Sequence, residues 1–371
     1  MNLLVRPFSK LVFFLLAILF CSCQTEQKTI PITFDRNSFL LNMADGFIVP
    51  AYNQLLAESQ FLNIKTEEFT QNPNLETLKI LQGSWTSTYS VWQKANAFNF
   101  GPAGEEGIRK TLLEEIAIFP VNESKINSIL ETNTFNINDF SRDSRGFSAV
   151  EYLIFNTQND NDKILTACKS ESSKRYLKAL TSHIVQRVKF VSDAWNSSYK
   201  DEFLKNNGTE SGSSTSTFYN EFVKSFEALK NFKVGLPLGK RPGQTTTMPG
   251  LVEAKYNGKS LDFLKLHIQN LNQIWNGKPY KSDAEGLGFK KYLDNVEGGK
   301  ELVALSESQM LNVNKAINEI SNSTRFSDLL SSDPAKIENL HTELQKQTRF
   351  FKSDMSSVLG IAITYSSGDG D

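Results

Sequence analysis

Cysteine and histidine are scarce in this sequence, with three of each among 371 residues. So few thiols exclude a framework of disulfide bonds, and so few thiols and imidazoles together exclude an array of zinc fingers. An excess of charge is also lacking, because the formal net charge is −1 at pH 7. Without a basic excess, nucleic acid is not expected as a partner.

Apolar and aromatic residues are present in the proportion typical of a folded protein. Hydrophobic residues make up 39% of the chain and charged residues 22%, and there are 27 phenylalanines. This composition indicates a globular protein with a large core rather than a disordered chain. The length is sufficient for two domains of ordinary size.

The first residues have the anatomy of a secretion signal. Arg6 and Lys10 give a positive start, and Leu11–Phe20 is an apolar run of ten residues. That run is too short to span a bilayer and is typical of the core of a signal peptide. Ser22 before Cys23 resembles a bacterial lipobox, in which the cysteine after the cleavage site receives a lipid. An ordinary secretory signal with an incidental cysteine is the alternative.

The predicted processing removes a signal peptide at residues 1–22 and lipidates Cys23, which then holds the protein on a membrane. The expected location is therefore the bacterial cell envelope, on the outer membrane, facing either the periplasm or the surface. Residues 23–36 are mostly polar and predict a tether. Cleavage also removes Cys21 and leaves Cys168 as the only free thiol, so no intramolecular disulfide is expected.

Apolar residues recur at helical spacing through most of the remaining chain. Leu78, Trp85 and Trp92 lie seven residues apart, as they do at the seam of a helical bundle. The two tryptophans could form a ligand platform, but core packing explains them better because they continue a leucine stripe. Residues 177–195 carry another apolar stripe with spacings of three and four. We therefore predict an all-α fold.

A polar segment divides the predicted helices into two packed bundles. Residues 206–217 are rich in Gly, Ser and Thr and predict a flexible linker or a long surface loop. They separate an N-terminal bundle at 37–205 from a C-terminal bundle at 218–371. The Gly- and Pro-rich residues 233–250 predict a non-helical crossover and lack the Gly-Lys-Ser/Thr of a phosphate-binding loop. The β-branched residues at 359–365 predict a short extended segment at the C-terminal end.

The stretch Gly146–Phe155 is nearly all apolar and predicts a central helix. Its two polar exceptions, Ser148 and Glu151, share one face because they lie three residues apart. An ionised carboxylate alone in apolar surroundings costs about several kcal/mol or more, so Glu151 must be paired, hydrogen-bonded, metal-bound or protonated. One possibility is a purely structural carboxylate bonded to Tyr152, Arg145 or backbone groups.

This stretch resembles the Gly-x-His-x-x-Glu signature of the imelysin family. The members of this family are helical bacterial envelope proteins that were first described as peptidases and were later linked to iron uptake. Gly146 and Glu151 match the signature, whereas Ser148 stands at the histidine position. The Phe-Gly-Pro turn at 100–102 and the Gly-x-Pro-x-Gly segment at 235–239 add to the likeness, which extends over most of the chain. The resemblance implies two helical bundles, with the signature helix near their interface.

The resemblance also implies a binding or uptake role for iron or another metal, with an outer-membrane receptor or uptake proteins as candidate partners. In the family signature, a histidine and a glutamate three residues apart could share a cation. Here Glu151 keeps an oxygen ligand and is the candidate ligand for Fe or Zn, while Ser148 offers only a hydroxyl. We take Gly146, Ser148 and Glu151 as candidate ligand-contact residues and assign no catalytic residue.

Two other functions remain open. A surface scaffold that has kept the fold and lost the site is favoured by Ser148. A metallopeptidase, the older label of the family, needs a metal with an open coordination position and a general base. The chain has no HExxH motif, and three histidines are a thin supply of ligands for such a site. The final acids, Asp369 and Asp371, predict a solvated tail rather than a calcium site, which needs more ligands.

Overall fold

The computed structural model describes residues 34–156, 160–282 and 284–365. These residues form helices and connecting loops without a β-strand, which confirms the predicted all-α fold. No helix in the described part is both long enough and apolar enough to cross a membrane. The predicted signal peptide, the lipidation site Cys23, most of the tether and the acidic residues at the C-terminal end lie outside the described residues.

The described chain begins with one nearly continuous helical run from Arg36 to Gln71. It comprises α2 (Arg36–Met43), the π-helical segment η1 (Ala44–Ile48) and α3 (Val49–Gln71). Pro50 lacks the N–H that the interior of an α-helix needs. The wider π turn, closed by a hydrogen bond from Val49 N–H to Ala44 O, directly precedes this proline. The chain therefore continues as a helix past Pro50.

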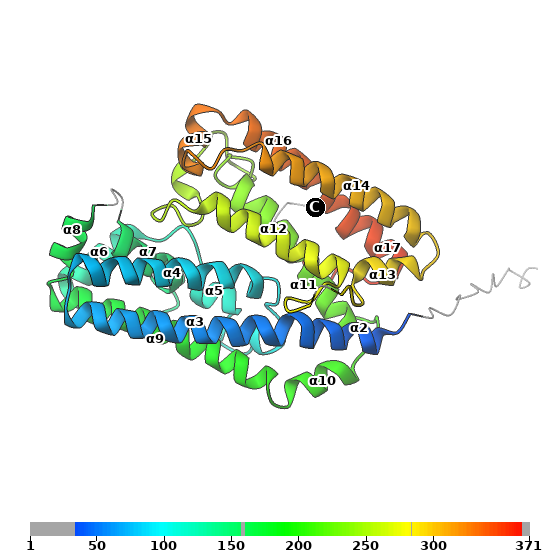
Figure 1. The fold of residues 1–371 in the computed structure, drawn as a ribbon, viewed down its shortest axis with the longest axis horizontal. Coiled ribbons are helices and arrows are strands. Elements are labelled where there is room, and N and C mark those ends of the chain that lie inside the picture. The colour runs from blue at the N-terminus through cyan, green and yellow to red at the C-terminus, as the bar shows by residue number, and fades with distance from the viewer. Residues whose placement is uncertain (1–33, 157–159, 283, 366–371) are drawn as a thin grey trace, which may run out of the picture. The chain divides into compact units, whose positions relative to one another are not determined.

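Helix α3 packs lengthwise against two other long helices, α4 (Leu75–Ala95) and α9 (Glu171–Trp195) (Figure 1). Along α4, Leu78, Trp85 and Trp92 are all buried. Their spacing of seven residues places them on the face that meets the neighbouring helices, as the sequence pattern indicated.

Shorter helices connect these three and cover their ends. The signature stretch forms α7 (Gly146–Phe155), which packs against α4 and α9. The remaining short elements of this part are η2 (Gly101–Ala103), α5 (Leu112–Ile116), α6 (Glu123–Thr132), η3 (Arg142–Ser144), α8 (Asn161–Ala167) and α10 (Tyr199–Lys205).

The later part of the chain is organised around α11 (Ser214–Ala228), which continues directly into the π-helical segment η4 (Leu229–Gly235). Helix α11 starts before the apolar stripe at Phe218 because the Ser213 side chain caps it by accepting the N–H of Ser216. The elements that follow are η5 (Pro249–Leu251), α12 (Ser260–Asn276), α13 (Phe289–Asp294), α14 (Gly299–Asn318), α15 (Phe326–Ser332), α16 (Ala335–Arg349), the π-helical η6 (Phe350–Asp354) and α17 (Met355–Leu359).

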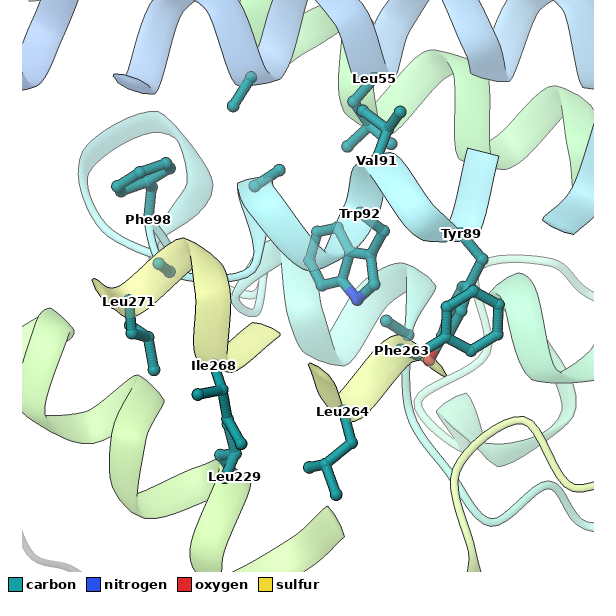
Figure 2. Close-up of a cluster of buried hydrophobic side chains, with 14 of the residues drawn as sticks. Leu55, Tyr89, Val91, Trp92, Phe98, Leu229, Phe263, Leu264, Ile268 and Leu271 are labelled. Atoms are coloured by element: carbon teal, nitrogen blue, oxygen red, sulfur yellow. The ribbon is translucent and has the colours of Figure 1, made fainter. Parts of the chain in front are cut away.

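Helices α4 and α12 meet in a buried apolar core. The rings of Tyr89 and Phe263 pack edge to face with centroids 4.9 Å apart. Figure 2 shows this cluster, in which side chains of α4 lie near those of α12 and η4: Tyr89, Val91, Trp92, Phe263, Leu264, Ile268, Leu271 and Leu229. This core joins the α3–α4–α9 layer to the later helices.

The described residues from Phe34 onward group as one compact unit. The division into bundles at 37–205 and 218–371 stays a prediction. Between these ranges, the loop before α11 is tied by hydrogen bonds to α2, since Arg36 Nε donates to Asn207 O at 2.7 Å.

The C-terminal end of the described chain is not helical. After α17, residues 361–365 run without a helix along α11. Asn220 of α11 holds this segment, because its Nδ2 donates to Ala362 O at 3.0 Å and its Oδ1 accepts the N–H of Thr364 at 2.8 Å. The contact continues to Tyr365, the last described residue, whose hydroxyl donates to Glu227 near the C-terminal end of α11.

Candidate functional site

Helix α7 begins at Gly146 in a backbone conformation that glycine alone adopts readily. Its φ angle is +73°, and a Cβ atom built there would lie 2.3 Å from Ile116 O. Conformation and space both exclude a side chain at this position. The close approach places the start of α7 directly against the segment that ends α5, and so positions Ser148 and Glu151.

Ser148 and Glu151 are both buried, and both hydrogen-bond to main-chain groups of other segments. Ser148 Oγ donates to Ile118 O at 2.8 Å. Glu151 is 2% exposed, and its Oε1 accepts the N–H of Asn257 at 2.7 Å. Asn257 also donates through Nδ2 to Thr86 Oγ1 at 2.9 Å. Helix α7 is therefore tied on one side to the chain after α5 and on the other to the chain between η5 and α12.

Burial controls the protonation of Glu151. Removal from water raises its pKa to about 8, although the N–H groups of Asn257 and Tyr256 oppose this rise, and the nearby Glu253 carboxylate adds to it. The carboxyl group is therefore mostly protonated at neutral pH. A neutral acid that already accepts a backbone hydrogen bond is a poor ligand for a cation.

Arg145 does not pair with Glu151, which the sequence left open. Its guanidinium forms a short, buried ion pair with Glu115, the last acid before the end of α5. Burial acts to raise the pKa of Glu115, but Arg145 and further hydrogen bonds hold it below its usual value. Tyr152, the other side chain considered as a hydrogen-bond partner of Glu151, instead donates to Asn127 Oδ1 at 2.9 Å. Glu151 thus relies on backbone groups.

The surroundings of Glu151 do not fit a bound Fe or Zn ion. Ser148 uses its hydroxyl to donate to a carbonyl group, and Glu151 is hydrogen-bonded and mostly neutral. Within the described ranges, no group of three His, Cys, Asp or Glu side chains is arranged to hold a metal ion. His183 and His267 are buried in helices, and burial lowers the pKa of each. His341 lines a different cavity.

The raised pKa of Glu151 predicts a pH dependence of stability. The folded protein holds this proton up to pH about 8, whereas the unfolded chain releases it near its ordinary value of about 4.3. The stabilisation is therefore fully present below about pH 4.3 and is lost as the pH rises toward 8, with a slope of up to about 1.4 kcal/mol per pH unit. Urea unfolding of the wild type and of Glu151→Gln between pH 5 and 8 measures this pH dependence of the free energy of unfolding. Glutamine cannot titrate, so the loss of stability with rising pH should be smaller in Glu151→Gln. The same pH dependence in both proteins would contradict the assignment.

A buried charge pair lies between α4, η4 and the chain before α12. Lys233 Nζ lies 3.0 Å from Glu253 Oε1 and donates to Gln93 Oε1 at 2.5 Å. The Tyr89 hydroxyl donates to the same Glu253 oxygen at 2.8 Å. Burial lowers the pKa of Lys233, and the Glu253 carboxylate acts against that shift. The second carboxylate oxygen, Oε2, has no hydrogen-bond partner in the described part of the chain.

Both residues of this charge pair line a cleft with a volume of about 390 Å³. Most of the wall is apolar and comes from α4, from the chain around the end of α5, and from α11 and η4: Trp92, Leu113, Ala117, Ile118, Phe119, Ala228 and Phe232. The cleft is also lined by further residues with polar groups: Asn96, Lys224, Glu227, Asn231 and Tyr365. Because Ser148 holds the carbonyl of Ile118, helix α7 supports one wall of this cleft.

Sequence reasoning found α7 but did not select Lys233 or Glu253. Both residues are polar exceptions in apolar surroundings, since Lys233 stands between Phe232 and Val234, and Glu253 stands between Val252 and Ala254. The same criterion singled out Glu151. If this criterion were applied to every apolar run in the chain, it would select both residues. It would not show that they contact each other.

The chain is similar in sequence to a known protein family and to a known protein. The sequence model of the imelysin family, peptidase M75, matches residues 48–350. Iron-regulated protein A of Synechococcus elongatus is 22% identical over 283 residues, which cover 73% of this chain and 71% of that protein.

Two solved structures are similar to this chain. A putative iron-regulated protein A precursor from Parabacteroides distasonis has a TM-score of 0.70 at 16% identity, over 87% of this chain and 95% of the other. An imelysin-like protein from Psychrobacter arcticum has a TM-score of 0.69 at 17% identity, over 89% of this chain and 97% of the other. The TM-scores show that this chain shares its fold with both structures. Since the family match spans most of the sequence, the chain belongs to the imelysin family.

Proposed function

We propose that this chain is a binding protein with an iron-related role, held at the bacterial envelope by a lipid on Cys23, and that the cleft is its ligand site. The iron-related role rests on the relatives named iron-regulated protein A. The anchor rests on the basic and apolar residues before Ser22 and Cys23. Labelling of expressing cells with radioactive palmitate tests the anchor, because Cys23→Ala should abolish the label.

The cleft carries the proposal because its lining combines mostly apolar side chains with a buried charge pair. Its volume of about 390 Å³ lies within the range of roughly 300–1,000 Å³ found for small-molecule sites. Glu253 Oε2 is a buried acceptor without a partner among the described groups, and Lys233 places a positive charge in the lining of the cleft. These features favour a small ligand with an apolar body and one polar end.

Filling the cleft should weaken the binding of such a ligand. Ala228 lines the cleft, so Ala228→Leu and Ala228→Trp add increasing volume inside it. With anilinonaphthalene sulfonate, an apolar fluorophore with one anionic group, we expect Ala228→Trp to weaken binding at least about ten-fold and Ala228→Leu to weaken it less. Fluorescence titration of the detergent-solubilised chain measures both affinities.

The matched control is Ala304→Trp, on an exposed position of α14 outside the cleft, which should leave the dye affinity unchanged. Equal affinities in all four proteins would contradict a ligand site in the cleft. In that case the scaffold function, which the hydrogen-bonded Ser148 and Glu151 favour, would take its place.

The metal and peptidase hypotheses are tested on the same proteins. Stoichiometric binding of Fe or Zn by the wild-type chain in calorimetry would contradict the proposal and restore Glu151 as a ligand. Binding by Ser148→His alone would indicate a site that lapsed with the missing histidine. Metal-dependent cleavage of a protein substrate that ceases in Glu151→Gln would favour the peptidase.

A further inference from the structure

One side of the cleft does not come from a helix. Tyr365 lines the cleft and belongs to residues 361–365, which follow α17 without a helix. The rest of the lining comes from helices or from chain that connects two helices. We call residues 361–365 the strap, because they run along α11. The cleft is therefore bounded in part by a segment that belongs to no helix.

The residues of the strap alternate between buried and exposed. Ile361 is buried, and Ile363 and Tyr365 pack against the core. Ala362 and Thr364, which lie between them, are exposed. A period of two is that of an extended chain with one face on the protein. Tyr365 therefore lies on the face that is turned toward the body of the protein, where it contributes to the lining of the cleft.

Asn220 of α11 fixes the middle of the strap. Its Nδ2 donates to Ala362 O and its Oδ1 accepts the N–H of Thr364, so a single amide group makes the pair of bonds that a neighbouring strand would make. Nδ2 also donates to Ser216 O at 2.9 Å, and Asn220 is buried, so the amide is held in one orientation. Asn220 does not line the cleft, and it acts on the cleft through the strap.

The side chain of Tyr365 is fixed at its far end by Glu227. The hydroxyl donates to Glu227 Oε2 at 2.5 Å, and Glu227 is buried and also lines the cleft. Lys352 Nζ lies 3.1 Å from the other oxygen, Oε1, so the carboxylate is held from two sides. Burial, together with the hydrogen bond to this carboxylate, raises the pKa of Tyr365, so its hydroxyl stays a donor at neutral pH. Main chain and hydroxyl thus hold the ring between them.

The cleft is small enough for one aromatic side chain to matter. Its volume of about 390 Å³ lies near the lower end of the roughly 300–1,000 Å³ found for small-molecule sites. A tyrosine is among the largest side chains and buries about 150–250 Å² of surface. Removal or displacement of Tyr365 therefore enlarges a site of this size considerably.

The strap is the part of the boundary that can move without disturbing a helix. Trp92, by contrast, is 1% exposed and lies within α4, so its displacement would break the helical core. The strap packs on one face only, and its exposed residues leave the other face in water. Segments with few buried contacts open at a lower free energy than the helices of a core. A ligand that is too large for the cleft therefore displaces the strap before it displaces a helix.

We propose that Tyr365 sets the size of the ligand that the cleft accepts, and that Asn220 is the positioning residue that holds Tyr365 in place. The inference rests on the proposed function, since it requires the cleft to be the ligand site. It adds the class of ligand. A compact molecule with one apolar body fits while the strap is in place, whereas a molecule with two such bodies enters only when the strap is displaced.

Fluorescence titration with two dyes tests the inference. Anilinonaphthalene sulfonate has one apolar body, and its covalent dimer, bis-anilinonaphthalene sulfonate, has two. Each variant of the detergent-solubilised chain is titrated with both dyes against a detergent blank, and the ratio of the two affinities is compared with that of the wild type. We expect Tyr365→Ala to shift this ratio toward the dimer at least about ten-fold. Tyr365→Leu, which keeps part of the side chain, should shift it less.

Asn220→Ala is expected to shift the ratio in the same direction by at least about three-fold, although Asn220 lies outside the cleft. A general loss of stability would lower both affinities by the same factor, so the ratio separates a positioning role from a merely structural one. In the Tyr365→Ala background, Asn220→Ala should add little, because the side chain that it positions is gone. The matched control is Phe140→Ala, which removes a ring that is 75% exposed and outside the cleft and should change the ratio less than about two-fold.

The outcomes separate this inference from the proposed function. An unchanged ratio in both Tyr365 variants, in a chain whose dye binding Ala228→Trp weakens, overturns the inference and leaves the cleft as the ligand site. Dye binding that Ala228→Trp does not weaken overturns both. A shift in Tyr365→Ala that Asn220→Ala does not share supports Tyr365 as the size limit and overturns the positioning role of Asn220.

Discussion

Gly146→Ala is expected to lower the free energy of unfolding by about 3 kcal/mol or more. The methyl group would require a φ near +73° from a residue that disfavours it, and would lie 2.3 Å from the carbonyl oxygen of Ile116. Neither the start of α7 nor the main chain at Ile116 can move without disturbing the hydrogen bonds of Ser148 and Glu151. Urea unfolding followed by circular dichroism measures the change.

Gly83→Ala provides the matched control. Gly83 lies inside α4, and a Cβ atom there meets no other atom within 4 Å. Alanine favours a helix interior over glycine, so this substitution should raise stability by about 0.5–1 kcal/mol. If Gly146→Ala and Gly83→Ala changed stability alike, α7 would not approach Ile116 as closely as the structure has it.

Lys233→Met is expected to lower the free energy of unfolding by about 3–5 kcal/mol at neutral pH. Methionine keeps the apolar length of the side chain but removes the charge, so Glu253 is left as a buried carboxylate with Tyr89 as its remaining donor. A buried charge without a counter-charge is costly, because the protein interior solvates it poorly. Urea unfolding measures the loss.

Two further variants distinguish the charge from the packing. Lys233→Met/Glu253→Gln removes both charges and should recover most of the lost stability. Lys346→Met, at a side chain that is 55% exposed, should change stability by less than about 0.5 kcal/mol. A double variant as unstable as Lys233→Met alone would mean that packing around the lysine stem, rather than the charge pair, stabilises this region.

The fold could be predicted from the sequence because its main elements have local patterns. The apolar spacing along α4 predicted which face is buried, and Leu78, Trp85 and Trp92 are indeed inside. The apolar stretch Gly146–Phe155 predicted a central helix and forms α7. Helical periodicity is a property of neighbouring residues, so it needs no knowledge of the rest of the structure.

The candidate site could be predicted only in part, because its partners come from distant segments. Glu151 was selected as a buried carboxylate, but the group that satisfies it is the N–H of Asn257, and a backbone N–H has no signature in the sequence. Arg145 is close to Glu151 in the chain but pairs with Glu115. The meeting of Lys233 with Glu253 depends on how η4 packs against the chain between η5 and α12, which local patterns do not determine.

The buried pair of Lys233 and Glu253 joins two segments that are far apart in the chain and that both line the cleft. Lys233 lies in η4, and Glu253 lies in the chain between η5 and α12. A substitution that breaks the pair therefore acts on the shape of the cleft as well as on the stability of the fold. In Lys233→Met, stability and dye affinity should fall together, whereas Ala228→Trp should lower the dye affinity with a smaller effect on stability.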